Sequence, residues 1–153
     1  MKPIIKTFQE LSTEEIYQII QLRVDVFIVE QRGIYSDLDD KDQNSLHLFY
    51  KENEQIIGYL RILPPGLAFD TYAIGRVCIH EEARKNGLGR KILRDALAHL
   101  DHEIKASKIT ISAQEYLIDF YKTLDFKQIT PVYVEHDGIP HADMERMIPV
   151  SPV

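Results

Sequence analysis

The chain has 153 residues, of which 44% are hydrophobic and 27% charged, and its formal net charge is −6. This length allows one domain with a well-formed hydrophobic core and is short for two, so we expect a single domain over residues 1–153. The acidic balance argues against a nucleic-acid-binding protein, which would present a cationic surface to phosphates. Cys78 is the one cysteine. An internal disulfide is therefore excluded, and a reducing compartment is favoured.

The sequence contains no segment that predicts transport into or across a membrane. The first ten residues, MKPIIKTFQE, lack the apolar stretch and cleavage pattern of a secretory signal. No uncharged apolar run approaches the roughly 20 residues that span a bilayer. We therefore expect a cytoplasmic protein with no membrane partner.

The first half of the chain predicts a strand, a helix and a pair of strands. Ser12 and Glu15 have the spacing of a capping box, which marks the start of a helix. Apolar residues then recur at helical spacing as far as Phe27, so the helix is expected to continue to about residue 29. Polar residues that predict a loop follow, and two β-rich segments come after them. In order, the expected elements are a strand at 2–8, a helix at 13–29, a loop at 35–44 and strands at 46–51 and 55–63.

The second half predicts strands that alternate with helices, and a final pair of strands. A β-rich segment runs directly into a basic turn, and the helix behind that turn is strongly amphipathic. In order, the expected elements are a loop at 64–72, a strand at 73–80, a helix at 88–100, a strand at 108–113, a helix at 114–124, and strands at 126–136 and 143–150 around a loop at 137–142. This alternation implies an α+β fold of the mixed α/β type.

The basic turn at residues 84–90 reads RKNGLGR. A helix N-terminus carries unpaired backbone N–H groups and the positive end of the helix dipole. Gly87 and Gly89 would let the backbone approach a phosphate closely, and the flanking cations would add positive charge. An ordinary helix start with a tight turn and solvated cations fits the same residues. Neither the Walker A pattern nor the full Rossmann fingerprint is present, so the turn by itself leaves both interpretations open.

The order of the motifs resembles the GNAT superfamily of acyl-CoA-dependent N-acyltransferases. Residues 77–93, VCIHEEARKNGLGRKIL, are similar to its acyl-CoA loop, with R-x-x-G-x-G in register. Residues 113–126, AQEYLIDFYKTLDF, are similar to its motif beside the thioester. The stretches LRVDVFIVEQ, RILPP, IGRV and DGIPHADM resemble the ElaA-like branch. The fold that this implies is a three-layer α/β/α sandwich whose twisted mixed sheet splays at its centre.

The resemblance implies that acetyl-CoA binds as a co-substrate and that its acetyl group moves directly to a primary amine. The pyrophosphate would lie on the N–H groups of the basic turn, and the pantetheine arm would pair with the splayed strand. A backbone N–H of that strand would polarise the thioester carbonyl. Tyr121 stands where the superfamily's leaving-group acid usually lies, and a phenol there can protonate the departing thiolate. The cofactor-binding residues implied are Val77, Cys78, Ile79, Arg84, Lys85, Asn86, Gly87, Leu88, Gly89, Arg90 and Gln114.

The residue that accepts a proton from the amine is left open by the sequence. Glu30 ends the first helix, where the family's acceptor pocket begins, and His141 lies in a loop that can approach the same pocket. His80, which follows the cofactor strand, is a further possibility. Each has an ordinary alternative: an ion pair with Arg23 or Arg61 for Glu30, and a solvated or core imidazole for the histidines. Glu30 and His141 are the catalytic candidates beside the tyrosine.

Other residues carry weaker signals. The acidic loop, with Asp37, Asp39 and Asp42, is spaced like a calcium site but lacks the glycine and the final acidic ligand of an EF-hand. No metal is therefore predicted, and a solvated loop or an acceptor-site acid is expected instead. Cys78 is expected to be a small buried residue and not a nucleophile. Asp125 stands where the family usually ends the helix with glycine.

The sequence is consistent with three functions. The favoured one is an acetyl-CoA-dependent N-acetyltransferase that acts on a small amine or a lysine side chain. The second is an enzyme similar to acyl-homoserine-lactone synthases, which LRVDVF, the acidic loop and RILPP also resemble, although the intact RKNGLG turn favours free acyl-CoA as the donor. The third is a non-catalytic acyl-CoA-binding module. A homodimer is possible, and the sequence does not identify the acceptor.

Overall fold

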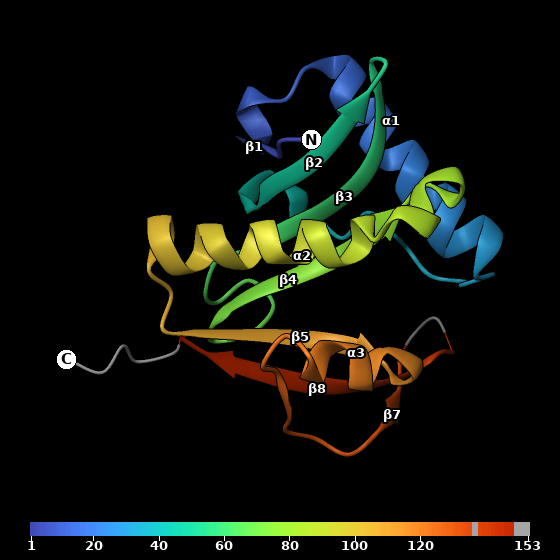
Figure 1. Cartoon of the computed structure of the whole chain (residues 1–153). Coiled ribbons are helices and arrows are strands. Elements are labelled where there is room, and N and C mark those ends of the chain that lie inside the picture. Colours follow the sequence, from blue (N-terminus) through green and yellow to red (C-terminus); the bar gives the residue numbers. More distant parts are fainter. Residues whose placement is uncertain (136–137, 149–153) are drawn as a thin grey trace.

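The computed structural model describes residues 1–135 and 138–148. Among these residues, eight strands form one mixed sheet in the order β1-β2-β3-β4-β5-β8-β6, and β7 pairs with β8 (Figure 1). The strands are β1 Ile4–Thr7, β2 Leu46–Glu52, β3 Gln55–Leu63, β4 Tyr72–Ile79, β5 Lys108–Gln114, β6 Lys127–Gln128, β7 Tyr133–Val134 and β8 Pro140–Met147. The helices are η1 Phe8–Glu10, α1 Thr13–Arg23, η2 Val24–Glu30, η3 Asp42–Asn44, η4 Glu81–Asn86, α2 Leu88–His99, η5 Leu100–Ile104, η6 Glu115–Leu117 and α3 Ile118–Lys122.

The capping box predicted from the sequence starts α1. The backbone N–H of Glu15 donates to the Ser12 hydroxyl over 3.1 Å, and the N–H of Ser12 donates to the Glu15 carboxylate over 2.8 Å. Two of the orphan donors at the helix start are satisfied in this way. The α-helix ends at Arg23 and continues as π-helical turns in η2 to Glu30. The expected extent of the first helix is therefore confirmed, although its last two turns are wider than an α-helix.

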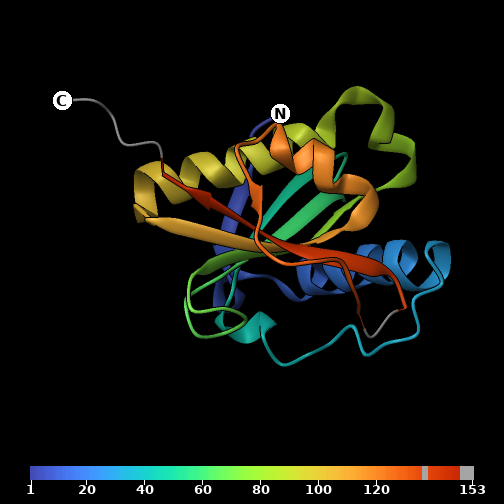
Figure 2. The ribbon, with the colours of Figure 1, turned by 90° about the horizontal axis from the view of Figure 1, so that it is seen from below.

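Helices cover both faces of the sheet. Figure 2 shows α1 on one side of the strands and α2 with α3 on the other. The apolar stripe of α2, which includes Ile92 and Ala96, packs in one buried cluster with residues of β2 to β5. Ile19 and Leu22 of α1 lie in a second cluster on the opposite face, together with Cys78. The three-layer α/β/α sandwich expected from the resemblance is confirmed.

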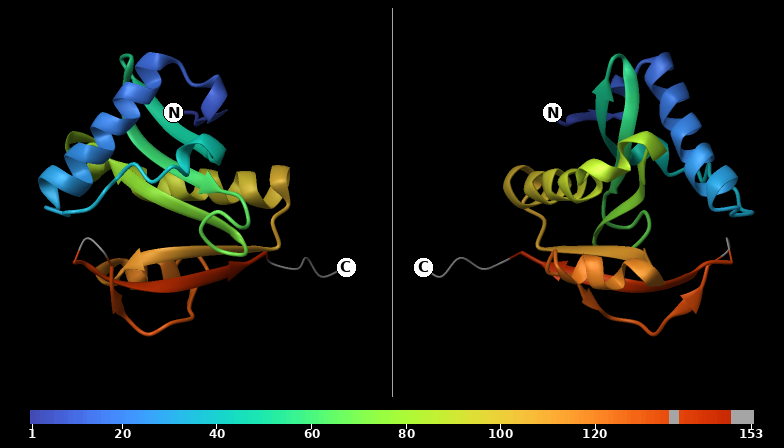
Figure 3. Two further views of the ribbon diagram at one scale, coloured as in Figure 1. Left: turned by 180° about the vertical axis from the view of Figure 1, so that it is seen from behind. Right: turned by 45° about the vertical axis from the view of Figure 1, so that its right-hand side comes forward.

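The sheet is splayed between β4 and β5. These parallel strands pair only at Tyr72 with Ile109 and at Ala73 with Thr110. Figures 1 and 3 show the two strands meeting at one end and diverging toward the other. In β4, Arg76 has a φ of +51°, and the register against β3 shifts at this bulge. A bulge increases local twist and bends the strand, which carries the second half of β4 away from β5.

The C-terminal segment differs in detail from the expectation. Residues 137–142 were expected to be a loop, but β8 begins at Pro140, so His141 lies on a strand. The expected strand at 126–136 is instead the two short strands β6 and β7, with Pro131 between them. Proline has no N–H to give to a ladder, so the pairing is interrupted there. Residue 136 of the expected strand at 126–136, residue 137 of the expected loop, and residues 149 and 150 of the expected last strand lie outside the described part of the chain.

Within residues 1–135 and 138–148, none of the helices combines the length and the apolar character that crossing a membrane would require.

Candidate active site

A cleft of about 810 Å³ opens where β4 and β5 separate. Its walls come from β4, the start of α2, β5, α3, β8 and the loops that follow η2 and β3. Several predicted site residues line it together: Val77, Arg84, Gly87, Gly89, Arg90, Gln114, Tyr121 and His141. The structure thus brings together residues that are up to 64 positions apart in the sequence, the separation between Val77 and His141.

The basic turn forms the start of α2 at one end of this cleft. Gly87 is the N-cap residue, with a left-handed backbone (φ 69°, ψ 18°), and no side chain caps the helix. The first turn, from Leu88 to Arg90, therefore directs backbone N–H groups outward without the side-chain partner that Ser12 supplies to α1. The dipole of a helix of 12 residues adds to this positive potential. The turn has the geometry of an anion-binding site.

The splayed half of β4 forms the adjoining wall. Beyond Ala73 the edge of β4 that faces β5 has left the β5 ladder, so its backbone groups are available to an extended ligand. Val77 lines the cleft, whereas the side chain of Cys78 is 3% exposed and packs on the α1 side of the sheet. Burial raises the pKa of the Cys78 thiol. A buried thiol with a raised pKa is unreactive, which agrees with the structural role expected for Cys78.

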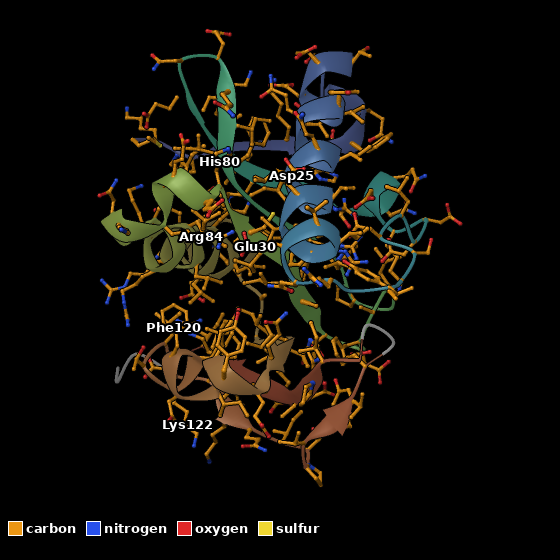
Figure 4. The ribbon with its side chains drawn as sticks, turned by 90° about the vertical axis from the view of Figure 1, so that its right-hand side faces the viewer. Asp25, Glu30, His80, Arg84, Phe120 and Lys122 are labelled. Atoms are coloured by element: carbon orange, nitrogen blue, oxygen red, sulfur yellow. The ribbon has the colours of Figure 1, made fainter. Side chains whose placement is uncertain are left out.

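Glu30 and Arg84 form a bidentate ion pair. The Arg84 guanidinium donates to both carboxylate oxygens of Glu30 over 2.5 and 2.7 Å, and its Nε donates to the carbonyl of Ile79 over 3.0 Å. Figure 4 shows the two side chains facing each other between η2 and η4. The hydrogen bonds from Arg84 lower the pKa of Glu30. The ion pair that the sequence left as the alternative to a catalytic role for Glu30 is present, but its partner is Arg84 and not Arg23 or Arg61.

Arg23 and Arg61 bind the acidic loop instead. Arg23 lies 2.9 Å from Asp37 and 2.8 Å from Asp42, while Arg61 lies 2.6 Å from Asp39 and 2.9 Å from Asp42. Asp37 and Asp42 are buried, so the expectation of a solvated loop is wrong for these two residues. Buried carboxylates are tolerated here because each has a guanidinium partner. The network fixes the loop against one wall of the cleft.

Tyr121 is a buried phenol on the cleft wall. Its ring packs edge-to-face with Phe120 and Phe126, at centroid distances of 5.4 and 5.8 Å. Burial raises its pKa, so the hydroxyl remains protonated over the physiological range. Asp125, with a φ of +70°, adopts the left-handed conformation in which the family usually has glycine. The chain therefore turns after α3 as the family pattern requires.

His141 is held in one orientation on β8. Its side chain is 8% exposed, and its Nδ1 lies 2.7 Å from the carbonyl oxygen of Ile139. A carbonyl only accepts hydrogen bonds, so Nδ1 carries the hydrogen and Nε2 is the acceptor in the neutral ring. No described residue lies within hydrogen-bonding distance of Nε2. His141 lines the cleft, and Nε2 is the ring nitrogen that can accept a hydrogen bond from a ligand.

The other predicted residues have different surroundings. His80 is the N-cap of η4, where its Nδ1 accepts from the N–H of Glu82, and it is not among the cleft-lining residues. Gln114 donates from its amide to Gln31 over 3.1 Å, which joins the end of β5 to the end of η2. Among the described residues, Lys85 and Asn86 are exposed and do not line the cleft. Leu88 and Ile79 are buried.

The sequence did not predict the cluster of polar side chains that lies beside His141. Ser112 lies 2.7 Å from the Tyr133 hydroxyl, and that hydroxyl donates to Asp143 over 2.5 Å. Glu135 accepts from Ser112 over 3.2 Å, and both Ser112 and Glu135 line the cleft. The alternation of polar and apolar residues along β5 contained a signal for Ser112. Nothing in the sequence indicated that β7 would place Tyr133 and Glu135 beside it.

Comparison with known proteins places this geometry in a family. A family model described as an acetyltransferase (GNAT) domain matches residues 9–148. ElaA of Escherichia coli is 34% identical over 141 residues, which cover 91% of this chain and 92% of ElaA. The ElaA crystal structure aligns with a TM-score of 0.86 at 31% identity, covering 95% of this chain and 99% of that chain. The crystal structure of an acyl-CoA N-acyltransferase from Pseudomonas aeruginosa aligns with a TM-score of 0.88 at 34% identity, over 95% and 99% of the two chains. The chain therefore belongs to the GNAT acetyltransferase family, an acyl-CoA-dependent transferase family, and is similar to ElaA.

Proposed function

We propose that the protein is an N-acetyltransferase that moves the acetyl group of acetyl-CoA directly to a primary amine, and that residues 1–153 form the single domain which does so. The observation that carries this proposal is the cleft. One cavity contains the splayed half of β4, the uncapped start of α2, a buried phenol and an oriented imidazole. The synthase-like and non-catalytic alternatives have no comparable support.

In the proposed complex, the pyrophosphate lies on the backbone N–H groups at the start of α2, between Gly87 and Arg90. The pantetheine arm extends along the free edge of β4 at Val77 and pairs with its main chain, and Cys78 and Ile79 contribute through their backbones. A backbone N–H in this segment polarises the thioester carbonyl. Holding the acyl carbon and the amine in one cleft supplies the orientation that direct transfer needs.

The proton transfers can be assigned to His141 and Tyr121. The acceptor arrives as an ammonium ion and gives one proton to Nε2 of His141. The neutral amine then attacks the thioester carbonyl, a C–N bond forms and the C–S bond breaks. Tyr121 protonates the departing thiolate and regains a proton from the nitrogen. His141 passes its proton to water, so the products are the acetylated amine, the CoA thiol and one proton.

His141 is favoured over Glu30 as the base for geometric reasons. It lines the cleft and presents an unshared electron pair, whereas both oxygens of Glu30 accept hydrogen bonds from Arg84. The lowered pKa of Glu30 also makes its carboxylate a weaker proton acceptor. A catalytic role for Glu30 remains a prediction, and the expected role of its ion pair is to join η2 to η4.

The test is release of CoA thiol that depends on an added primary amine. We expect the wild-type protein to release thiol from acetyl-CoA only when an amine from a mixed panel is present. We expect His141→Gln to lower kcat by about a hundredfold and to remove the rising limb of the pH–rate profile, while Glu30→Gln keeps that limb. If Glu30→Gln removes the limb and His141→Gln keeps it, the base is Glu30. If no primary amine supports thiol release, the proposed activity is wrong.

A further inference from the structure

Most charged side chains in the cleft are already neutralised. Arg61 is paired with the acidic loop, Arg76 lies 2.9 Å from Asp37, and Arg84 is bound by Glu30. Arg90 packs over the Phe120 ring at the start of α2, where the pyrophosphate is proposed to lie. Arg61, Arg76 and Arg84 therefore present little unbalanced charge to an acceptor, and the charge of Arg90 is assigned to the pyrophosphate.

Glu135 is a cleft carboxylate without a cationic partner among the described residues. It follows β7, and its Oε1 has the Ser112 hydroxyl at 3.2 Å and the Tyr133 hydroxyl at 3.4 Å. Each hydroxyl has one hydrogen, and the Tyr133 hydrogen is given to Asp143 over 2.5 Å. Glu135 thus accepts at most one hydrogen bond, from Ser112. A carboxylate can accept about four, so most of the hydrogen-bonding capacity of Glu135 is unused among the described residues.

His141 and Glu135 both contact Tyr133, and both line the cleft. Tyr133, two residues before Glu135, pairs with His141 in the β7–β8 ladder, and their rings stack with centroids 6.5 Å apart. The imidazole is more than nine-tenths buried, and its Nε2 has no partner within the described part of the chain. A carboxylate and an oriented imidazole in one cleft can each form a charge-assisted hydrogen bond with an entering ammonium ion.

Lys41 supplies the complementary charge. It lies in the loop between η2 and η3, lines the cleft, and has no carboxylate within ion-pair distance among the described residues. Glu135 comes from the C-terminal part of the sheet, so the two uncommitted charges enter the cleft from its two halves. Lys41 and Glu135 have charges of opposite sign, and both side chains are partly buried.

We propose that the acceptor is a zwitterion, an amine that also carries an acid group: Glu135 binds its ammonium end beside His141, and Lys41 binds its carboxylate or other acid group. This inference rests on the proposed N-acetyltransferase function and names the substrate class of the same cleft. The bound ammonium gives its proton to His141 as described above, and Glu135 takes no part in that proton transfer. Glu135 and Lys41 therefore determine which amine is bound and do not take part in bond making.

The experiment compares amine acceptors that differ only in the group at the end of the carbon chain opposite the reacting amine. The probes are a homologous series of ω-amino acids from glycine to 6-aminohexanoate, each with the n-alkylamine and the α,ω-diamine of the same length. Steady-state kcat/KM is measured with acetyl-CoA for each probe. Binding of the same probes to the protein saturated with CoA is measured by calorimetry, which needs no turnover.

For the wild-type protein, we expect the amino acid of the best length to exceed its matched alkylamine by about tenfold in kcat/KM and in affinity, and to exceed the diamine by more. Lys41→Gln should lower the value for the amino acid to that for the alkylamine. Glu135→Gln should raise KM for every amine by about tenfold to a hundredfold, with a small change in kcat. Lys127→Gln and Glu145→Gln are matched controls, because these residues face each other in the β6–β8 ladder outside the cleft.

The outcomes separate this inference from the proposed function. If diamines or plain alkylamines are acetylated as well as amino acids, or if Lys41→Gln keeps the preference for the acid, the zwitterion proposal is wrong and the acetyltransferase stands. If no probe is acetylated although amino acids bind to the CoA complex through Lys41 and Glu135, the site is correct and the reaction is wrong. If the probes neither react nor bind, the inference fails.

Discussion

The hydroxyl of Tyr121 is the clearest single-residue test of the chemistry. The ring is fixed between Phe120 and Phe126, and burial raises the pKa of the phenol, which keeps it in the protonated form that the proposed acid needs. We expect Tyr121→Phe to lower kcat by about a hundredfold, as loss of a general acid does, because the packing of the ring is retained. Calorimetry should show nearly unchanged CoA affinity. Full activity in this variant would mean that water or another side chain gives the proton to the departing thiolate.

At the same scale, Glu15 stabilises the fold. It is buried, caps α1 and lies 3.0 and 2.9 Å from the ammonium groups of Lys6 and Lys51. Burial by itself would raise its pKa, but the Ser12 N–H and the two lysines outweigh burial and lower the pKa to about 2, from 4.5. A depressed pKa contributes stability above the unfolded value, and that contribution is lost as the pH falls from about 4.5 to about 2.

We therefore expect Glu15→Gln to destabilise the protein by about 1 to 3 kcal/mol at pH 7 and by progressively less below the unfolded pKa. Urea unfolding at neutral and acidic pH measures both values. Glu14→Gln is the control, because Glu14 is exposed and makes only a hydrogen bond with Gln18. A destabilisation of Glu15→Gln that is independent of pH would mean that packing, and not charge, accounts for the role of Glu15.

At the scale of elements, the start of α2 can be tested without straining the backbone. Gly87 has a positive φ, so a side chain there would disturb the turn itself. Gly89 is helical, and an added Cβ would meet only Ile79 Cγ1 at 3.9 Å, an ordinary contact. An acidic residue in a first turn suits the helix dipole. Gly89→Asp should consequently fold and still repel a pyrophosphate.

We expect Gly89→Asp to weaken acetyl-CoA binding by at least about a hundredfold, measured by calorimetry, while its melting temperature without ligand stays near that of the wild type. Gly89→Ala is the matched control. It gains up to about 1 kcal/mol of helix propensity and introduces no charge, and it should bind acetyl-CoA. If Gly89→Asp binds acetyl-CoA as tightly as the wild type, the pyrophosphate does not lie at the start of α2.

For the whole molecule, we expect the separation of β4 from β5 to make the free energy of unfolding depend on bound acetyl-CoA. Two residue pairs join β4 to β5, and a cofactor that extends along the free edge would add contacts to both halves of the sheet. A ligand at a hundredfold its dissociation constant stabilises the folded state by about 2.7 kcal/mol. For a domain of this size the melting temperature should rise by about 5 to 10 °C with acetyl-CoA. Gly89→Asp should show no such rise, and a wild-type protein without a rise would contradict cofactor binding in this cleft.

Local patterns determined most of the elements. The capping box at Ser12, the amphipathic stripe of α2 and the β-rich runs are properties of neighbouring residues, so the sequence predicted their positions to within a few residues. The basic turn and the tyrosine motif had a fixed order along the chain, from which the family could be recognised and was then confirmed.

The partners of charged side chains could not be predicted in the same way. Glu30 binds Arg84, which is 54 positions away, because the fold places the end of η2 against η4. His141 was expected in a loop but lies on a strand, because β8 pairs with the whole length of β5. In this ladder His141 is opposite Gln114. Such contacts depend on packing between distant segments, for which periodicity contains no information.

The sequence by itself determined the family, the helix that starts at the basic turn and the motif that contains Tyr121, because each depends on residues close together in the chain. Only the tertiary structure decided that the bulge at Arg76 lies where β4 leaves β5, that Glu30 is paired with Arg84, and that Lys41 and Glu135 line the cleft without an ion pair among the described residues. The physical reason is that a charge is neutralised by whichever group the fold brings within a few ångströms of it.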